Sequence, residues 1–176
     1  LQGAIGITPL GEVAKLEISA GDFVTTDWNW LRANRTALKA LTHFTITDSI
    51  NSVADIPDTE YGNPYFSRKI NELSMAKIAR VGMHTFMGCN ALTTISFPNL
   101  TSIGGFAFRG CTALSTANFP LVTSIGGRAF IYCTALSSVN FPLAMSIGFE
   151  AFSGCTSLSA TKFPQVTSID SYAFLD

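Results

Sequence analysis

A unit of 22 residues repeats through the second half of the chain. Cysteine recurs at this interval as Cys89, Cys111, Cys133 and Cys155. The other columns of the unit, in the same register, are Phe86, Phe108, Phe130, Phe152 and Phe174, then Leu92, Leu114, Leu136 and Leu158, the Phe-Pro pairs that start at Phe97, Phe119, Phe141 and Phe163, and the Ser-Ile pairs at 102–103, 124–125, 146–147 and 168–169. A fixed period between roughly 20 and 50 residues is the signature of a stacked-repeat fold. The sequence therefore predicts a solenoid in which successive units lie on one another.

Each unit also contains a short strand signature, with apolar residues at its first, fourth and sixth positions, as in Leu92, Ile95 and Phe97. The same signature starts at positions 13, 41 and 70 in the first half of the chain and at 92, 114, 136 and 158 in the second. Alternation of apolar and polar residues indicates a strand with one buried face. We therefore expect seven coils, the first two longer and less regular than the others.

Turn signals separate these strands. The proline after each strand lacks an N–H and ends the ladder. Gly104, Gly126 and Gly148 stand where the chain turns, and Asp170 replaces glycine in the fourth copy. Because Asp tolerates a positive φ, we expect a left-handed residue at this position. The Ala-Phe-x-x-Cys segment fits a single helical or 3₁₀ turn, since residues three apart share one side of such a turn.

The unit Leu-x-x-(Ile/Val)-x-Phe-Pro-x-(Val/Leu)-Thr-Ser-Ile-Gly-x-x-Ala-Phe-x-x-Cys resembles the BspA-like leucine-rich repeat of bacterial surface proteins. The resemblance covers residues 79–176 closely and residues 1–78 in part, and it lacks the asparagine column of ordinary leucine-rich repeats. It implies an α/β solenoid with a right-handed coil, a parallel concave sheet of about seven short strands, and short helical turns on the convex side. It also implies a secreted or cell-surface protein that acts in adhesion or partner binding.

We expect one solenoid domain over residues 1–176, with regular repeats in 79–176 and irregular N-terminal coils and a cap in 1–78. Residues 47–69 form an insertion between the second and third strands. A loop of this length is either functional or simply tolerated. The length of the chain suits one ordinary domain.

A helix start is expected near residue 25. Thr25 or Thr26 would be its N-cap, with Asp27 near the positive end of the helix. Trp28 and Trp30 follow in this segment. Because a solenoid must cover its first coil, these two residues either belong to that cover or present an aromatic platform for a sugar ring.

The cysteine column is open to three interpretations: free buried thiols, two disulfides, or metal ligands. Neighbouring coils lie roughly 4.8 Å apart, which would permit a bridge between backbones. However, side chains that share one place in successive coils point inward in parallel, which suits a ladder of small apolar thiols. Metal sites need clustered ligands with short spacings. We therefore expect free thiols, no metal site and no cofactor.

The serine column, Ser102, Ser124, Ser146 and Ser168, lies beside the turn of each unit. A repeated hydroxyl in this place can bond loop amides of the next coil. We expect this column to take the place of the missing asparagine ladder.

Composition excludes several classes of function. The net charge is −1, without the basic excess of a nucleic-acid-binding protein. Hydrophobic residues make up 47% of the chain and charged residues 13%, so a sizeable core is expected and disorder is not. No apolar run approaches the roughly 18 residues of a membrane span. The chain begins with Leu1 and carries no visible export signal, so we expect such a signal to lie outside it.

Strand alternation identifies the side chains that point outward on the concave face. Most of them are small, polar and uncharged. The candidate binding residues are His43, Thr45, Glu72, Ser74, Thr94, Ser96, Thr116, Asn118, Ser138, Asn140 and Lys162. A second candidate surface is a column that changes character in every coil and is expected to face solvent: His84, Phe106, Arg128, Glu150 and Tyr172.

These patterns favour a binding or adhesion module for a protein or glycan partner, and the alternative is a passive spacer in a longer surface protein. Nothing after Phe174 resembles a polar cap. Either further repeats follow in the parent protein, or the last coil is exposed and open to end-to-end self-association. We do not expect an enzyme. His43 and Glu72 should be neighbours, with Ser74 diagonal to His43, but they lie on an open sheet without visible oxyanion donors or a closed cleft.

Overall fold

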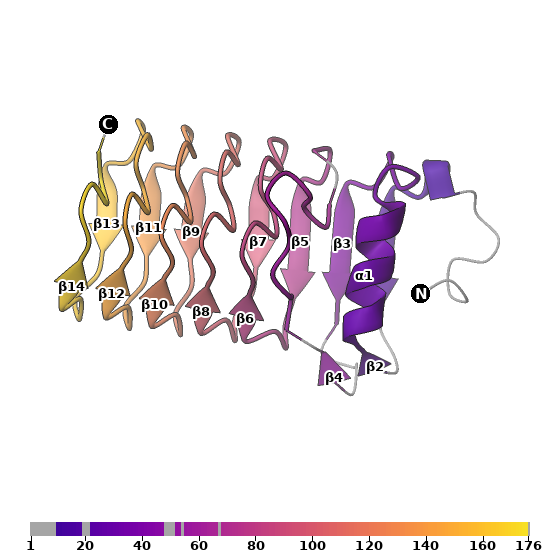
Figure 1. Cartoon of the computed structure of the whole chain (residues 1–176), viewed down its shortest axis with the longest axis horizontal. Helices are drawn as coiled ribbons and strands as arrows, with labels where there is room; N and C mark the ends of the chain where they lie inside the picture. Colours follow the sequence, from indigo (N-terminus) through magenta and orange to yellow (C-terminus); the bar gives the residue numbers. More distant parts are fainter. Residues whose placement is uncertain (1–9, 19–21, 48–51, 54, 67, 176) are drawn as a thin grey trace.

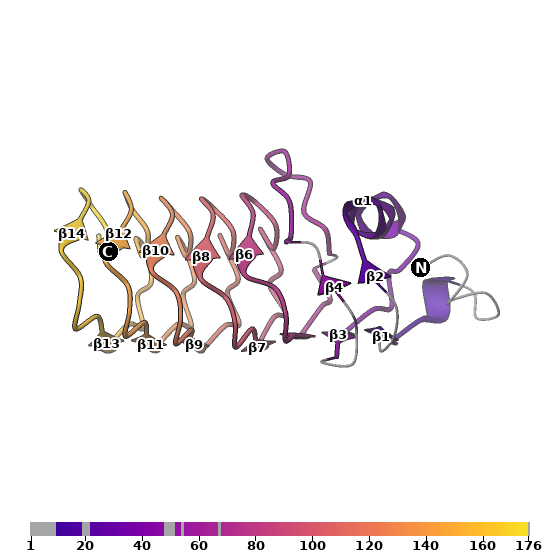
Figure 2. The ribbon, with the colours of Figure 1, turned by 90° about the horizontal axis from the view of Figure 1, so that it is seen from below.

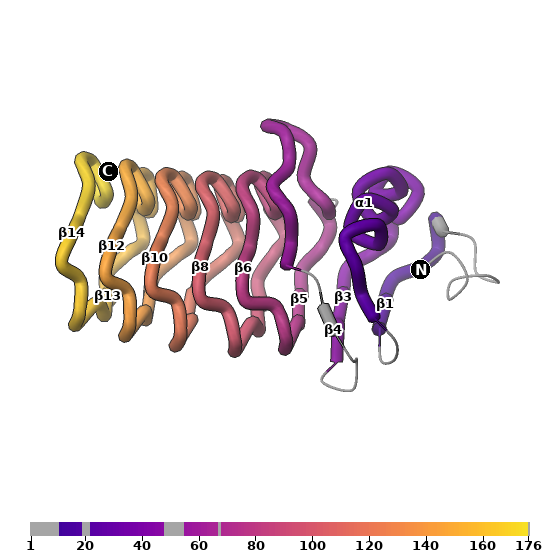
Figure 3. The backbone as a smooth tube through the Cα atoms, turned by 60° about the horizontal axis from the view of Figure 1, so that its bottom comes forward, coloured from indigo at the N-terminus to yellow at the C-terminus, as the bar shows by residue number. Residues whose placement is uncertain are grey.

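The computed structural model is an elongated stack of coils whose two ends lie far apart (Figure 1). It describes residues 10–18, 22–47, 52–53, 55–66 and 68–175. The backbone crosses from one side of the stack to the other and back once in each repeat (Figure 3). A short 3₁₀ helix, η1 (Leu10–Glu12), precedes the first strand.

Seven strands line one side of the stack, which we call the long-strand face. They are β1 (Lys15–Ile18), β3 (His43–Ile46), β5 (Glu72–Met75), β7 (Thr94–Ser96), β9 (Thr116–Asn118), β11 (Ser138–Asn140) and β13 (Ala160–Lys162). Each pairing is parallel, which confirms the predicted solenoid. The single expected sheet is divided into a four-stranded part, β1-β3-β5-β7, and a three-stranded part, β9-β11-β13.

A second set of parallel strands, which was not predicted from the sequence, lines another side of the stack, which we call the short-strand face. These strands are β2 (Asp22–Phe23), β4 (Ser52–Val53), β6 (Arg80–Val81), β8 (Ser102–Ile103), β10 (Ser124–Ile125), β12 (Ser146–Ile147) and β14 (Ser168–Ile169). The last five form one sheet, and β2 pairs with β4. In Figure 2 the long strands lie along the lower edge of the stack and the short strands lie above them. In β8, β10 and β12 the isoleucine is buried and the serine is half-buried, so even a two-residue strand has an inner side.

The Phe-x-x-Cys segments form single turns of the 3₁₀ type. The Cys111 N–H donates to the Phe108 carbonyl (3.1 Å), and the Leu114 N–H donates to the Cys111 carbonyl (3.1 Å). The same two bonds recur two coils later, where the Cys155 N–H donates to the Phe152 carbonyl and the Cys155 carbonyl accepts the next one. The expected helical turns are therefore short hydrogen-bonded turns that return the chain to the next long strand.

The repeated apolar side chains form continuous files inside the stack. Phe86, Phe108, Phe130 and Phe152 are at most 1% exposed. Their rings stack in sequence with centroids 5.2 Å, 5.1 Å and 5.3 Å apart. Offset or parallel aromatic pairs add about 0.5–1.5 kcal/mol each beyond the burial of their area. In the last coil the file reaches solvent, where Phe174 is 41% exposed.

Gly104, Gly126 and Gly148 are glycine for a reason other than the expected one. None of these residues has a positive φ. Instead, a Cβ on Gly126 would lie 2.6 Å from the backbone nitrogen of Gly105 in the preceding coil, and a Cβ on Gly148 would lie 2.6 Å from that of Gly127. The column therefore permits close contact between adjacent backbones.

The predicted helix is α1 (Thr25–Asn34), which lies on the side of the stack away from β1 and β3 (Figure 2). The N-cap is Val24, one residue before the expected threonines. Val24 has no side-chain oxygen to accept an N–H of the first turn, and the polar contact at the helix start runs the other way: Asp27 Oδ2 accepts the Val24 N–H at 2.9 Å. Trp28 is fully buried against Phe23, with ring centroids 4.6 Å apart. This burial excludes Trp28 as a platform for a sugar.

Part of the expected insertion at 47–69 lies outside the described residues, at 48–51, 54 and 67. Its described part, 55–66, runs alongside the equivalent part of the next coil. Ile56 forms a parallel bridge with Val81, and Phe66 stacks on Phe86 with centroids 5.6 Å apart. The segment adds one further ring to the phenylalanine file and projects beyond the neighbouring turns (Figure 2).

The hydroxyl ladder belongs to a different column from the one predicted. Among the described residues, the bonds between coils come from the threonines that precede the Ser-Ile pairs. Thr101 Oγ1 donates to the Ala79 carbonyl (2.8 Å), and Thr123 Oγ1 donates to the Thr101 carbonyl (3.3 Å). A matching ladder precedes the long strands, where Ser137 Oγ donates to the Ser115 carbonyl (3.1 Å). The hydroxyls therefore bond carbonyls of the preceding coil and do not bond loop amides.

Candidate functional site

The long-strand face has the register that strand alternation predicts. His43 is paired with Lys15 on one side and Glu72 on the other. In the second sheet, Ser138 is paired with Thr116 and with Ala160. The second outward row is also in register: Glu17, Thr45, Ser74 and Ser96 in the first sheet, and Asn118, Asn140 and Lys162 in the second. The structure thus brings the predicted residues onto two neighbouring surfaces of one face.

Polar contacts on this face are few and solvent-exposed. His43 Nε2 lies 3.4 Å from Glu72 Oε2, and the two side chains are 31% and 46% exposed. Exposed ion pairs contribute only about 0–1 kcal/mol. Asn140 Nδ2 donates to Asn118 Oδ1 at 2.8 Å. Ser74 makes no hydrogen bond to His43 within the described part of the chain, so these residues do not form a nucleophile–base pair.

The variable column forms a surface of its own, which we call the turn ridge: His84, Phe106, Arg128, Glu150 and Tyr172. All five residues have φ between 51° and 59°. The left-handed conformation costs a residue with a Cβ roughly 1–2 kcal/mol. The turn thus places one outward side chain per coil in a conformation that glycine would adopt more easily. Sequence reasoning found the column but not its backbone conformation.

Arg109 lies at the centre of an aromatic cluster beside this ridge. Its guanidinium carbon is 5.3 Å from the ring centroid of Tyr61, 5.9 Å from that of Phe106 and 5.7 Å from that of Tyr132. Tyr61 and Tyr132 are 60% and 50% exposed. The guanidinium makes no hydrogen bond or ion pair with any residue that the structure describes. We call these four residues the Arg109 cluster.

Tyr132 occupies a place, directly before the cysteine, that the coils of Cys89, Cys111 and Cys155 fill with glycine. Gly88, Gly110 and Gly154 hold the equivalent positions with φ of 73°, 67° and 69°, and Tyr132 has φ of 61°. Its ring lies against Gly154, where an added Cβ would come within 2.5 Å of a ring carbon. Residues held in sparsely populated backbone conformations concentrate at functional sites. This exchange of glycine for tyrosine is visible in the sequence, although the repeat analysis did not use it.

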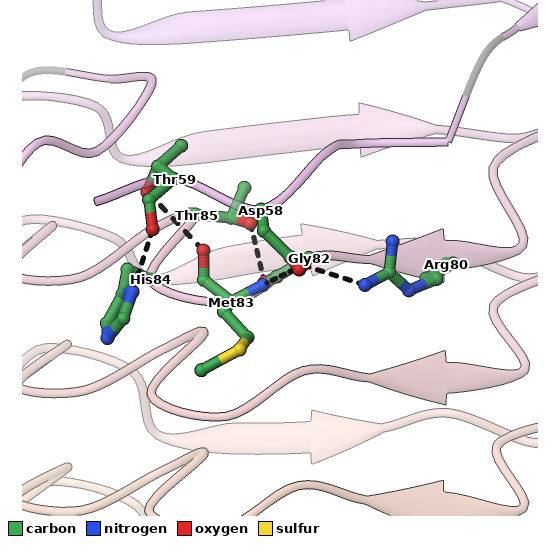
Figure 4. A network of polar contacts seen from close by, with 7 residues as sticks. All are labelled: Asp58, Thr59, Arg80, Gly82, Met83, His84 and Thr85. Atoms are coloured by element: carbon green, nitrogen blue, oxygen red, sulfur yellow. Dashed lines mark hydrogen bonds and ion pairs between the residues drawn. The ribbon is translucent and has the colours of Figure 1, made fainter. Parts of the chain in front are cut away.

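A polar network fixes the segment that carries Tyr61 to the adjacent coil (Figure 4). Asp58 Oδ1 accepts the Met83 N–H at 2.8 Å and Arg80 Nη2 at 2.7 Å. Thr59 reinforces the contact, because its N–H donates to the Met83 carbonyl (2.9 Å) and its own carbonyl lies 2.9 Å from His84 Nδ1. These bonds set the position of Tyr61, whose ring meets that of His84 edge to face.

Arg128, the arginine of the turn ridge, is already paired with a carboxylate. Arg128 Nε donates to Glu150 Oε2 at 2.7 Å, and its guanidinium carbon lies 5.0 Å from the ring centroid of Phe149. Of Arg109 and Arg128, Arg109 is therefore the one whose guanidinium has no carboxylate partner among the described residues and is available to an external anion.

The four cysteines take no part in either surface. All are free and buried, and the Cys133 Sγ donates to the Phe108 carbonyl at 3.1 Å. Burial raises the pKa of Cys89 to about 12, and it also raises the pKa values of Cys111 and Cys133. Such thiols are protonated and unreactive at neutral pH. Among the described residues, no group of His, Cys, Asp and Glu side chains is placed to hold a metal ion.

The stacked parallel coils and their outward rows define a leucine-rich repeat solenoid. The profile of the BspA type leucine-rich repeat region matches residues 60–176 in six copies. The chain therefore belongs to the BspA type leucine-rich repeat family.

Two solved structures have the same fold. A leucine-rich repeat protein from Bacteroides ovatus ATCC 8483 is 30% identical, with a TM-score of 0.64 over 78% of this chain and 35% of its own. The chain thus spans about a third of that protein. The leucine-rich repeat protein of T. pallidum is 20% identical, with a TM-score of 0.65 over 93% of this chain and 72% of its own. A comparison with curated proteins finds no match. Within the described residues, no helix is long and apolar enough to cross a membrane.

Proposed function

We propose that this chain is an extracellular or cell-surface binding module that contacts a protein partner through the Arg109 cluster. Repeat solenoids of this family are in general scaffolds for protein interaction or surface display, which supports a binding role over an enzymatic one. The observation that carries the choice of surface is Tyr132, an exposed tyrosine in a left-handed position where the other regular coils have glycine.

The composition of the cluster supports a protein partner. Tyrosine and arginine are the residues most enriched at binding hot spots. Arg109 is held between aromatic rings and retains its N–H donors, which match the geometry of a carboxylate. The ring faces of Tyr61 and Tyr132 that Arg109 covers are not available for stacking on a sugar. A carboxylate on the surface of a protein therefore suits this site better than a neutral glycan.

The long-strand face is the alternative surface within the same proposal. It presents Asn118, Asn140 and their neighbours in a regular polar array, and this array lacks the tyrosines and arginines of a hot spot. A contact there would rely on many weak hydrogen bonds. Secretion or display at the cell surface belongs to the proposal as well, and the family supports it.

A binding screen separates the two surfaces. Immobilised extracellular proteins and glycans would be probed with the wild-type chain, with Arg109→Ala plus Tyr132→Gly, and with Asn118→Arg plus Asn140→Arg. We expect at least one protein to bind the wild type and the long-strand variant, and to lose at least about tenfold in affinity for the cluster variant. Thermal unfolding of each variant would serve as the folding control.

Two results would contradict this assignment. Loss of binding in the long-strand variant alone would move the site to the predicted concave residues. Absence of binding to any immobilised protein or glycan would favour the passive spacer.

A further inference from the structure

A second site lies in a cleft of about 420 Å³ between the segment that follows α1, the loop before β5 and the turn at Met87. Its volume falls within the range of roughly 300–1,000 Å³ that is usual for small-molecule sites. None of the residues of the Arg109 cluster lines the cleft. The two sites are adjacent, because Gly62 of the lining follows Tyr61 and the Gly88 N–H donates to the Arg109 carbonyl (2.7 Å). No side chain of the Arg109 cluster is needed for the ligand proposed below.

The charge of the cleft is one-sided. Its described lining contains the basic side chains of Arg35, Lys39, Arg68 and Lys69 and no acidic side chain. Lys39 and Arg68 are exposed, and their side chains make no hydrogen bond or ion pair within the described ranges. Because the whole chain has a net charge of −1, this concentration of cations is local. A concave surface lined by one sign of charge concentrates ligands of the opposite sign.

Arg35 is fixed in position. Its Nη1 donates to Asn63 Oδ1 (2.6 Å) and to the Arg32 carbonyl (3.3 Å). Its Nε and Nη2 have no acceptor among the described residues. A guanidinium held in this way keeps three N–H donors for an oxyanion, with little side-chain entropy left to lose on binding.

Part of the lining is apolar. Pro64, Phe66 and Met87 contribute to it, and Phe66 is largely buried. The accessible parts of these side chains can contact the carbon framework of a ligand while its charged groups reach the basic side chains. The distribution of four basic side chains suits a ligand with more than one strongly charged group.

We propose that this cleft binds a small molecule that carries two or more sulfate or phosphate groups. Arg35 and Arg68 would contact one group through N–H donors, and Lys39 would neutralise a second as a point charge. The shared chemistry is a tetrahedral oxyanion, which a sulfated sugar and a phosphorylated sugar both supply.

Calorimetric titration at low ionic strength tests this site. The probes are a trisulfated heparin disaccharide, its desulfated counterpart, fructose 1,6-bisphosphate and inorganic phosphate. We expect at least one of the two multiply charged sugars to bind in one-to-one stoichiometry, and the desulfated disaccharide not to bind. Stronger binding of the sulfated or of the phosphorylated probe would identify the source of the oxyanion.

Variants distinguish this site from general attraction. Arg68→Ala and Lys39→Ala should each weaken binding of the better probe about tenfold, the value of one charge-assisted hydrogen bond. Lys77→Ala removes an exposed positive charge outside the cleft and should leave the affinity unchanged. Thermal unfolding would confirm that all three variants are folded. Lack of binding by both charged sugars, or equal losses in Arg68→Ala and Lys77→Ala, would overturn the proposal.

Discussion

Phe130 and Phe152 are 22 residues apart in the chain, and their rings lie 5.3 Å apart with an angle of only 2° between their planes. Both side chains are at most 1% exposed. A single coil cannot bury either ring, because the two faces of each ring are covered by the coils before and after it. The repeat period therefore sets the packing geometry of the core directly.

Phe130→Ala should lower the free energy of unfolding by about 3–5 kcal/mol, because it removes a ring that is covered on both sides and leaves a cavity. Phe174→Ala is the matched control in the same file. Its ring is 41% exposed and stacks on one neighbour, so its loss should cost less than half as much. Urea unfolding of both variants measures the difference, and equal costs would contradict a continuous file.

Gly126→Ala and Gly110→Ala should differ for a steric reason. The new Cβ at position 126 would lie 2.6 Å from a backbone nitrogen, and two coils would have to separate. We expect a cost of about 3 kcal/mol or more. At Gly110 no atom lies within 4 Å, and only the φ of 67° is unfavourable, so we expect about 1–2 kcal/mol. Thermal and urea unfolding would compare the two; the opposite order would refute the close-contact role of the Gly126 column.

Tyr132→Gly and Tyr132→Ala both remove the exposed ring, but only glycine adopts the φ of 61° without penalty. The glycine variant should therefore be the more stable of the two, by about 1 kcal/mol. Urea unfolding under identical conditions would show this order. If alanine were equal or better, Tyr132 would carry no backbone strain, and the argument for its selection by binding would lose its support.

The stability of the chain should fall at alkaline pH because of its buried thiols. The pKa of Cys89 rises from 9.0 to about 12 on burial, so between these values the folded chain holds a proton that the unfolded chain has lost. Stability is then fully present below about pH 9 and decreases above it, by about 1.4 kcal/mol per pH unit for each such thiol.

Urea unfolding at pH 8 and pH 10 in the presence of a reductant measures this slope. Cys89→Ala should reduce it by the contribution of one thiol, whatever that variant does to stability at pH 8. An unchanged slope would mean that burial does not raise the pKa of Cys89.

The sequence was sufficient to predict the strands and their register on the long-strand face. Alternation of side chains identifies the outward residues, and the strand signature aligns them even outside the regular period. His43 and Glu72 both take the third place of their signatures, which start at 41 and 70, and this predicted their pairing. The short-strand face was not predicted, because a Ser-Ile pair is too short to show alternation. The break between β7 and β9 has no signal in the repeat either, since both strands have the same pattern.

Backbone conformation and distant contacts were the limits of sequence reasoning. Left-handed turns are usually signalled by glycine, and the turn ridge has none at its five positions. Asp170 suggested a left-handed residue in the column of Gly104, Gly126 and Gly148, and this prediction was wrong. Glycine in that column instead permits close contact between coils. The basic cleft had no signal at all, because Arg35 and Arg68 come from segments far apart in the sequence.

Disulfide formation between adjacent long strands tests the stacked register most directly. Thr116 and Ser138 are exposed or half-buried partners in β9 and β11, whereas Ala160 lies one strand further along. Mild oxidation should join the thiols of Thr116→Cys plus Ser138→Cys clearly faster than those of Thr116→Cys plus Ala160→Cys, because only the first two lie on adjacent strands. Joining of the second pair as fast as the first, or faster, would contradict a solenoid in which equivalent residues of successive coils lie side by side.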